Sequence, residues 1–219
     1  WKLPSIGIGN IEDLVDLLDA SSVTSGKPIW GTEFAYQTNP PDIALGTSPD
    51  LQAQWMAEAM DVAWTTTRMP VFGWYVMQDS GGDPDADWDS GLFDVMGAEK
   101  PAAAMFRRPV AVRKLQDGTV RVWGFSGIDA ANGQLVIRSS PTAAWVVLPA
   151  KRFDDGVLLA QGRYANNSQV AVQDTLGTGP LRSVASAWIE TDATRVLAGR
   201  GKNGGSKRAA RPTLVIRQA

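Results

Sequence analysis

The chain has 219 residues, enough for one large domain or two small ones, and its 44% hydrophobic and 20% charged residues are ordinary for a globular protein. It contains no cysteine and no histidine, which excludes disulfides, thiolate or imidazole metal sites, thiol nucleophiles and a Ser-His-Asp triad. Carboxylate, lysine, tyrosine and hydroxyl groups remain for chemistry, so a carboxylate-based hydrolase fits this composition, and so does a binding protein.

Charge is distributed unevenly along the chain, although the net charge is only −2. Residues 1–109 hold 16 acidic and 6 basic side chains, whereas residues 110–219 hold 7 acidic and 15 basic ones. This difference predicts two domains of different character with a boundary near Pro109. No apolar stretch is long enough for a transmembrane helix, and no signal peptide is recognisable. Because the chain begins with Trp1, we expect a mature product or a piece of a longer protein.

The first half of the chain alternates between helical and strand patterns. Leu51, Trp55 and Ala59 recur every four residues behind a Ser48-Pro49 helix start. The runs around Trp30 and Trp74 are short and continuously apolar, as in strands buried on both faces. The predicted elements, in chain order, are a helix over 11–18, a strand over 27–35, a helix over 48–66, a strand over 71–77 and a helix over 100–107. This order favours parallel βα units.

The second half changes to short runs that alternate apolar and polar residues, separated by Gly, Pro, Asn and Asp. The runs lie at residues 120–125, 135–138, 144–148, 157–160, 170–173, 186–190 and 214–217. About seven short strands with turns between them are typical of an antiparallel sandwich. We therefore expect residues 110–219 to form a sandwich that folds by itself.

Glu33 is the most conspicuous candidate for chemistry. It lies between Trp30 and Phe34 near the C-terminal end of a predicted buried strand, where an unpaired carboxylate is costly to bury. At the C-terminal end of a βα-barrel strand the same carboxylate faces the active-site mouth. A capped or salt-bridged structural glutamate is the alternative, and the residue pattern alone leaves both open.

Three segments of the first half together resemble one enzyme family. Residues 28–42, with the Thr32-Glu33 pair, are similar to the seventh-strand region of cellulase-like glycoside hydrolases, the (β/α)8 enzymes of the large retaining clan A. In that family a Thr-Glu pair at the end of strand seven presents the nucleophile. Residues 71–79 resemble strand eight of the same barrel, and residues 88–106, with a Lys-Pro-Ala motif, resemble its closing loop and last helix.

The resemblance implies an α/β plus all-β fold. Residues 1–109 would form a partial (β/α)8 barrel, made of its last two βα units, and residues 110–219 an appended antiparallel, immunoglobulin-like β-sandwich. A complete barrel needs about 250 residues, so an N-terminal barrel segment or a partner chain is also implied. Without it we expect the chain to be inactive, because the family's acid/base sits on strand four, often after an Asn, and this chain has no Asn-Glu pair.

For function, the resemblance implies an O-glycosyl hydrolase that acts on a polysaccharide or oligosaccharide by double displacement. Glu33 would be the catalytic nucleophile, and a second carboxylic acid about 5–5.5 Å away would protonate the leaving group and then activate water. Trp74, Gln78 and Asp79 would bind the substrate, with packing inside the protein as the alternative for Trp74. No metal, cofactor, nucleic acid or membrane span is expected, and the expected location is extracellular (secreted).

The acidic loop after the second predicted strand raises the question of calcium. Asp83, Asp85, Asp87 and Asp89 stand at every second position, as at the start of a calcium-binding loop. The glycine that such a loop needs at its sixth position is replaced here by Trp88. A solvated acidic loop is therefore the favoured interpretation.

The second half could instead act as a non-catalytic glycan- or surface-binding β-sandwich module. Its candidate contact residues are Trp123, Trp145 and Trp188. A basic, glycine-rich segment over residues 199–211 could contact phosphates or an acidic polysaccharide, although a solvated loop between strands is the alternative. Glycan binding by residues 110–219 alone would favour this interpretation over the enzyme.

Overall fold

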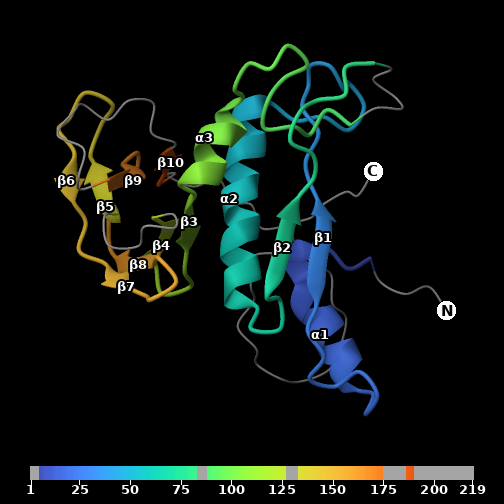
Figure 1. The fold of residues 1–219 in the computed structure, drawn as a ribbon. Helices are drawn as coiled ribbons and strands as arrows, with labels where there is room; N and C mark the ends of the chain where they lie inside the picture. The colour runs from blue at the N-terminus through green and yellow to red at the C-terminus, as the bar shows by residue number, and fades with distance from the viewer. Residues whose placement is uncertain (1–4, 83–87, 127–132, 175–185, 190–219) are drawn as a thin grey trace.

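The computed structural model describes residues 5–82, 88–126, 133–174 and 186–189 (Figure 1). It combines a parallel pair of strands, several helices and two antiparallel sheets. We call residues 5–82 and 88–109 the α/β region, and residues 110–126, 133–174 and 186–189 the two-sheet region. None of the helices in these ranges has the length and apolar character that crossing a membrane requires.

The α/β region is built around two parallel strands and the helix that connects them. Its elements are the 3-10 helix η1 (Ile8–Asn10), α1 (Ile11–Asp19), β1 (Trp30–Phe34), α2 (Pro49–Thr65), β2 (Val71–Trp74) and α3 (Pro101–Arg107). Trp30 stands opposite Val71 and Phe34 opposite Trp74, so the two strands run in parallel and end at the same edge (Figure 1). The parallel pairing predicted from the sequence is thus confirmed.

The two-sheet region contains eight described strands: β3 (Val110–Lys114), β4 (Val120–Phe125), β5 (Gly133–Arg138), β6 (Val146–Val147), β7 (Lys151–Arg152), β8 (Val157–Gly162), β9 (Gln169–Asp174) and β10 (Ser186–Trp188). They form two antiparallel sheets in the orders β3-β4-β8-β7 and β10-β9-β5-β6. A Cβ placed on Gly124 of β4 would meet Leu135 of β5 and Val172 of β9 at 2.8 Å. The sheets therefore pack face to face, and a side chain at position 124 would require Leu135 and Val172 to shift.

Helix α2 lies between the parallel strands and the two-sheet region (Figure 1). On one side, Ala59 and Ala63 contact Phe34 and Phe72 of the parallel strands. The other side carries Ala53, Met56 and Ala57, which are buried in a hydrophobic cluster that continues through α3 into both antiparallel sheets. The small alanine side chains let neighbouring elements approach α2 closely on both sides.

The face of the β1–β2 sheet opposite α2 carries exposed side chains, and we call it the open face. Trp30 is 65% exposed and Val71 is 40% exposed, although the two residues are register partners at the start of the sheet. In the described part of the chain neither strand has a second strand neighbour. The two-sheet region lies beyond α2 (Figure 1) and so does not supply the missing cover.

Most predicted elements match the structure, and the differences have simple causes. The sequence pattern does not predict β3, because this strand follows α3 with only Arg108 and Pro109 between them, nor β7, because it has two residues. The predicted strand over 214–217 and the basic segment over 199–211 lie outside the described residues.

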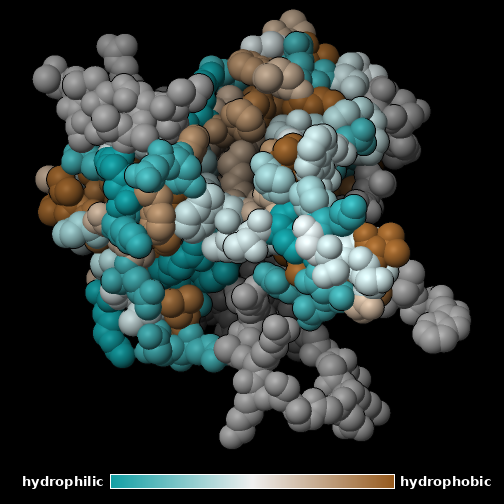
Figure 2. Space-filling view, turned by 60° about the horizontal axis from the view of Figure 1, so that its bottom comes forward, coloured by the Kyte–Doolittle hydropathy of each residue, from teal (hydrophilic) through white to brown (hydrophobic). Residues whose placement is uncertain are grey.

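Large apolar side chains reach the surface at several separate places. The face in Figure 2 shows brown patches divided by polar residues rather than one continuous apolar face. The most exposed of these side chains are Val23, Ile43, Met77, Trp30 and Met96, the last at 87%. Met77 and Met96 both belong to the long connection between β2 and α3, which also contains the predicted site residues Gln78 and Asp79.

Candidate active-site edge

Glu33 lies at the edge where β1 and β2 end and where the loops that follow them gather (Figure 1). Its neighbour Phe34 packs on the α2 side, with its ring centroid 4.9 Å from that of Phe72. Because adjacent strand residues point to opposite faces, Glu33 points to the open face, where it is exposed. Thr32 is exposed as well, since the register is irregular between Gly31 and Phe34.

Trp74 ends β2 with its ring turned toward the core. The ring centroid lies 6.0 Å from that of Phe34 and 6.3 Å from that of Tyr36. The indole N–H donates a hydrogen bond of 2.9 Å to the backbone oxygen of Ser90. This placement agrees with the packing alternative, and sugar binding by Trp74 stays a prediction.

Tyr75 and Trp88 contact each other at this edge, and neither belongs to the hydrophobic clusters. Their ring centroids are 5.5 Å apart in an edge-to-face arrangement, and Trp88 is exposed. The backbone N–H of Tyr75 donates a 2.9 Å hydrogen bond to the carbonyl of Phe34, which places Tyr75 beside the end of β1. The sequence contained a signal for this arrangement. Trp74 stands two residues after Phe72, and strand residues two apart point to the same face, so Trp74 faces inward with Phe72 and Tyr75 faces the other way.

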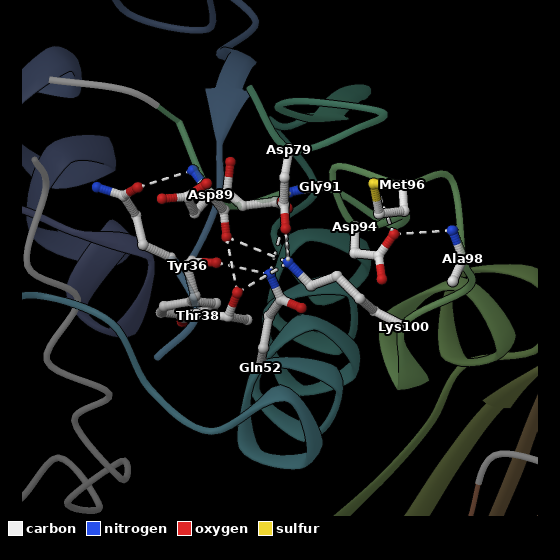
Figure 3. Close-up of polar contacts among 12 residues, drawn as sticks. Tyr36, Thr38, Gln52, Asp79, Asp89, Gly91, Asp94, Met96, Ala98 and Lys100 are labelled. Carbon is white, nitrogen blue, oxygen red and sulfur yellow. Dashed lines mark hydrogen bonds and ion pairs between the residues drawn. The ribbon is translucent and has the colours of Figure 1, made fainter. Parts of the chain in front are cut away.

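Asp79 and Lys100 form a buried ion pair behind the edge (Figure 3). Lys100 Nζ lies 2.9 Å from each carboxylate oxygen, and Oδ1 also accepts a hydrogen bond of 2.7 Å from the backbone N–H of Gly91. The ammonium group further donates to Thr38 Oγ1 at 2.9 Å and to the Asp89 carbonyl at 3.2 Å. One lysine side chain thus joins the loop after β1 and the loop after β2 to the start of α3.

The same contacts explain what Asp79 does in this structure. Its carboxylate is buried and holds Lys100 and Gly91, so it supports the loops that surround the edge. Sequence reasoning missed Lys100 because a lysine beside a helix start is ordinarily solvated, and only a known partner reveals a buried one. Its one signal was the position of Lys100 in the Lys-Pro-Ala motif.

Gln78 is exposed at the surface of the same loop. Its side-chain N–H donates to the carbonyl of Val95 at 3.1 Å. Close by in sequence, Asp94 Oδ1 accepts hydrogen bonds from the backbone N–H groups of Met96 and Ala98 at 2.9 and 2.8 Å (Figure 3). These bonds fix the turn that displays Met96. Of the three predicted substrate-binding residues, Trp74, Gln78 and Asp79, Gln78 is therefore the one whose side chain lies at the surface.

A buried glutamine ties both loops to the first turns of α2. Gln52 Nε2 donates to the backbone oxygen of Tyr36 at 2.7 Å and to that of Ser90 at 3.2 Å (Figure 3). Ser90 Oγ in turn donates to the carbonyl of Tyr75 at 2.6 Å.

Burial, with a smaller contribution from the nearby Glu58 charge, raises the pKa of Tyr36 far above its ordinary value. Its phenol therefore stays protonated and has no capacity to act as a base near neutral pH.

Within the described ranges, no group of three or more carboxylates is placed to hold a metal ion. Asp83, Asp85 and Asp87 lie outside these ranges. The remaining member of the alternation, Asp89, is buried, and its carbonyl accepts hydrogen bonds from Lys100 and from Thr38. Asp89 therefore contributes to the internal structure of the loop.

Comparison with known proteins gives a partial likeness to glycosidases. No protein-family model matches the chain, and no curated protein matches it by sequence. Among solved structures, a family 39 glycoside hydrolase from Bacteroides cellulosilyticus matches with 16% identity and a TM-score of 0.39, over 80% of this chain and 40% of the other. The chain therefore spans well under half of that enzyme.

Two β-glucuronidases match in the same way. One, from Bacteroides uniformis, has 9% identity and a TM-score of 0.37, over 82% of this chain and 23% of the other. The second, an FMN-binding β-glucuronidase from Faecalibacterium prausnitzii, has 12% identity and a TM-score of 0.39, over 84% of this chain and 30% of the other. At these identities and scores the matches record a distant structural likeness to glycoside hydrolases.

Proposed function

We propose that this chain is the part of a retaining glycoside hydrolase that carries the catalytic nucleophile, Glu33. The observation that carries the proposal is an exposed carboxylate at the C-terminal end of a parallel strand, on the open face of the sheet. Among the described residues Glu33 takes part in no ion pair, which argues against the salt-bridged structural alternative. The sequence resemblance of the segment around Thr32-Glu33 supports the same role.

The reaction would proceed by double displacement. A carboxylate oxygen of Glu33 attacks the anomeric carbon as the bond to the leaving oxygen breaks, and a second carboxylic acid gives that oxygen its proton. The same acid, now a carboxylate, takes a proton from water, and the water oxygen displaces Glu33 from the sugar. We assign the second acid to barrel strands that would cover the open face of the β1–β2 sheet, from an N-terminal segment or a partner chain.

For substrate binding, we propose that Tyr75 and Trp88 take the stacking role predicted for Trp74. Sugars present apolar C–H faces to aromatic rings, and Trp88 is exposed at the edge where Glu33 lies, whereas the Trp74 ring is turned to the core. The exposed Gln78 would bind a sugar hydroxyl. Asp79 would act indirectly, by holding the loops through Lys100. The substrate would be a polysaccharide or oligosaccharide, and the enzyme extracellular.

The deciding experiment is covalent trapping of the nucleophile in the complete enzyme. A 2-deoxy-2-fluoro glycoside with a good leaving group forms the glycosyl-enzyme and slows its hydrolysis, so the labelled peptide can be found by mass spectrometry. We expect the label on Glu33 and none in the Glu33→Gln variant. Labelling of another carboxylate in the wild-type enzyme would assign Glu33 to a structural role and refute the proposal.

A further inference from the structure

Trp88 differs from most other tryptophans of the chain in its exposure. Among the described residues, Trp30 and Trp88 are the tryptophans with exposed side chains, and Trp30 stands at the start of β1, away from the edge where this strand ends. Of the tryptophans considered from sequence in the second half, Trp123 is buried at 3% exposure, Trp145 is half-buried, and the Trp188 side chain lies outside the described structure. Trp88 is therefore the exposed tryptophan at the candidate active-site edge.

The peptide group that joins Trp88 to Asp89 is held at both ends. Its oxygen, which belongs to Trp88, accepts a hydrogen bond of 3.1 Å from the backbone N–H of Ser80. Its N–H, which belongs to Asp89, donates a hydrogen bond of 2.9 Å to the side-chain Oε1 of Gln37. Because a peptide group is planar, these two bonds fix its orientation, and with it the place where the Trp88 side chain leaves the backbone.

Gln37 is itself held in place within the loop that follows β1. Its backbone carbonyl accepts a hydrogen bond of 2.9 Å from the N–H of Thr47. The next residue, Thr38, donates from its backbone N–H and from its hydroxyl to the Asp89 carbonyl, each at 3.0 Å. The Gln37 side chain is half-buried between these contacts. The loop that follows Glu33 in the chain thus holds the backbone that carries Trp88.

The bond from Gln37 acts on a different peptide group from the contacts of Lys100. The ammonium of Lys100 and the two donors of Thr38 converge on the carbonyl of Asp89, which belongs to the peptide group leading on to Ser90. The N–H that Gln37 accepts from belongs to the peptide group leading back to Trp88. Gln37 therefore acts on the exposed tryptophan, whereas Lys100 holds the interior of the loop.

We propose that Gln37 is a positioning residue that fixes Trp88 for stacking on a sugar, an inference that rests on the proposed binding role of Trp88 and Tyr75. A ring whose backbone is already fixed loses less conformational freedom when a ligand binds, so positioning raises affinity without a new contact. The edge-to-face contact with Tyr75, at 5.5 Å between ring centroids, supports the ring itself. One loop would then carry on from the nucleophile Glu33 and also set the place of the stacking ring.

The first test uses NMR on the full 219-residue chain and the variant Gln37→Met, because methionine has a similar length but no amide oxygen. We expect the Asp89 amide to exchange with solvent about tenfold faster than in the wild type. The fluorine resonance of 5-fluorotryptophan at position 88, assigned with Trp88→Phe, should move toward its position in the unfolded chain. Gln37→Glu keeps an acceptor oxygen and should restore both signals.

Gln54→Met is the matched control, because Gln54 bonds to Glu58 at 3.0 Å on α2. It should change neither signal. Unchanged signals in Gln37→Met, or equal changes in Gln54→Met, would overturn the proposal. Thermal unfolding shows whether each variant is folded. If Gln37→Met does not fold, the wild-type chain decides, since an Asp89 amide that is not protected from exchange would refute the hydrogen bond to Gln37.

The second test measures inactivation of the complete enzyme by the 2-deoxy-2-fluoro glycoside that traps Glu33. Gln37→Met should bind this glycoside about tenfold more weakly, with an unchanged rate constant for labelling from the bound state, because Gln37 acts on Trp88 and leaves Glu33 in place. A lower rate constant with unchanged affinity would refute positioning of a binding residue. If the wild-type enzyme is not labelled at Glu33, the proposed function fails, whereas the NMR signals still decide whether Gln37 positions Trp88.

Discussion

The two sides of helix α2 differ in how completely they are covered. Toward the two-sheet region, Met56 and Ala57 are fully buried in a cluster that runs through both antiparallel sheets. Toward the parallel strands, α2 covers only one face, and on the other face Trp30 remains 65% exposed. The chain therefore closes its own core on one side of α2 and leaves a partly apolar sheet surface on the other.

Polar contacts show the same difference. Asp61 of α2 is 3% exposed and pairs with Arg113 at 3.1 Å and with Arg121 at 2.7 Å, both from the two-sheet region. Glu33, on the open side, has no such partner among the described residues. Charged side chains on the closed side therefore hold elements together, whereas the Glu33 carboxylate on the open side is exposed.

The largest effect should come from Glu33→Gln in the complete enzyme. The amide keeps the shape of the side chain but is not a nucleophile, so we expect kcat to fall on the order of a thousandfold or more, with the folded structure unchanged. Glu99→Gln is the matched control, because Glu99 is an exposed glutamate paired with Arg107 on the surface. Equal kcat values for the two variants would show that Glu33 matters no more for catalysis than an exposed surface glutamate.

Lys100→Met should produce the largest loss of stability. It removes one partner of a buried ion pair and leaves Asp79 charged and uncompensated, which costs about 3–5 kcal/mol in comparable sites. Urea unfolding measures this loss. The exposed pair offers the control, since Arg107→Met should cost no more than about 1 kcal/mol. Adding Asp79→Leu to Lys100→Met should restore part of the stability; a further loss would show that Asp79 contributes through Gly91 instead.

The helices and strands on both sides of α2 were easier to predict from the sequence than the contacts between their side chains. Helix α2 was predictable because Ser48 caps it, accepting a hydrogen bond from the Leu51 N–H, and because its apolar residues recur at helical spacing. The parallel pairing of β1 and β2 followed from the order strand, helix, strand. These features are local in the chain, and local patterns suffice to predict them.

The site was harder to predict because its contacts are distant in sequence. Lys100 meets Thr38, 62 residues away, and only the folded chain brings the two together. Gln52 likewise meets the Ser90 carbonyl, 38 residues away. The expectation that the second half folds alone stays a prediction, and the hydrophobic cluster that joins this half to α2 and α3 could not be read from local sequence patterns.

Met56→Ala should show whether that shared core acts as one unit. Met56 is fully buried where α2 meets the two-sheet region, and its truncation should cost about 2–5 kcal/mol. We expect hydrogen exchange to become faster in α2 and in β4 together, with coincident unfolding curves from circular dichroism and tryptophan fluorescence. Met96→Ala, at an 87% exposed position, is the control. Faster exchange confined to α2 would mean that the two regions unfold separately.

The smallest expected effect concerns pH at the closed side. Burial raises the pKa of Asp61 above its ordinary value of 3.8, and the charges of Arg113 and Arg121 only partly oppose this. At pH values between the pKa of Asp61 in the unfolded chain and its higher pKa in the folded chain, the folded chain binds more protons than the unfolded chain. Lowering the pH through this range therefore increases the free energy of unfolding, and raising the pH decreases it. Asp61→Asn cannot titrate and provides the reference. The free energy of unfolding of wild type minus that of Asp61→Asn should therefore increase between pH 7 and pH 4. A decrease over the same range would mean that the arginine charges outweigh burial and that the ionised carboxylate itself stabilises the contact between α2 and the two-sheet region.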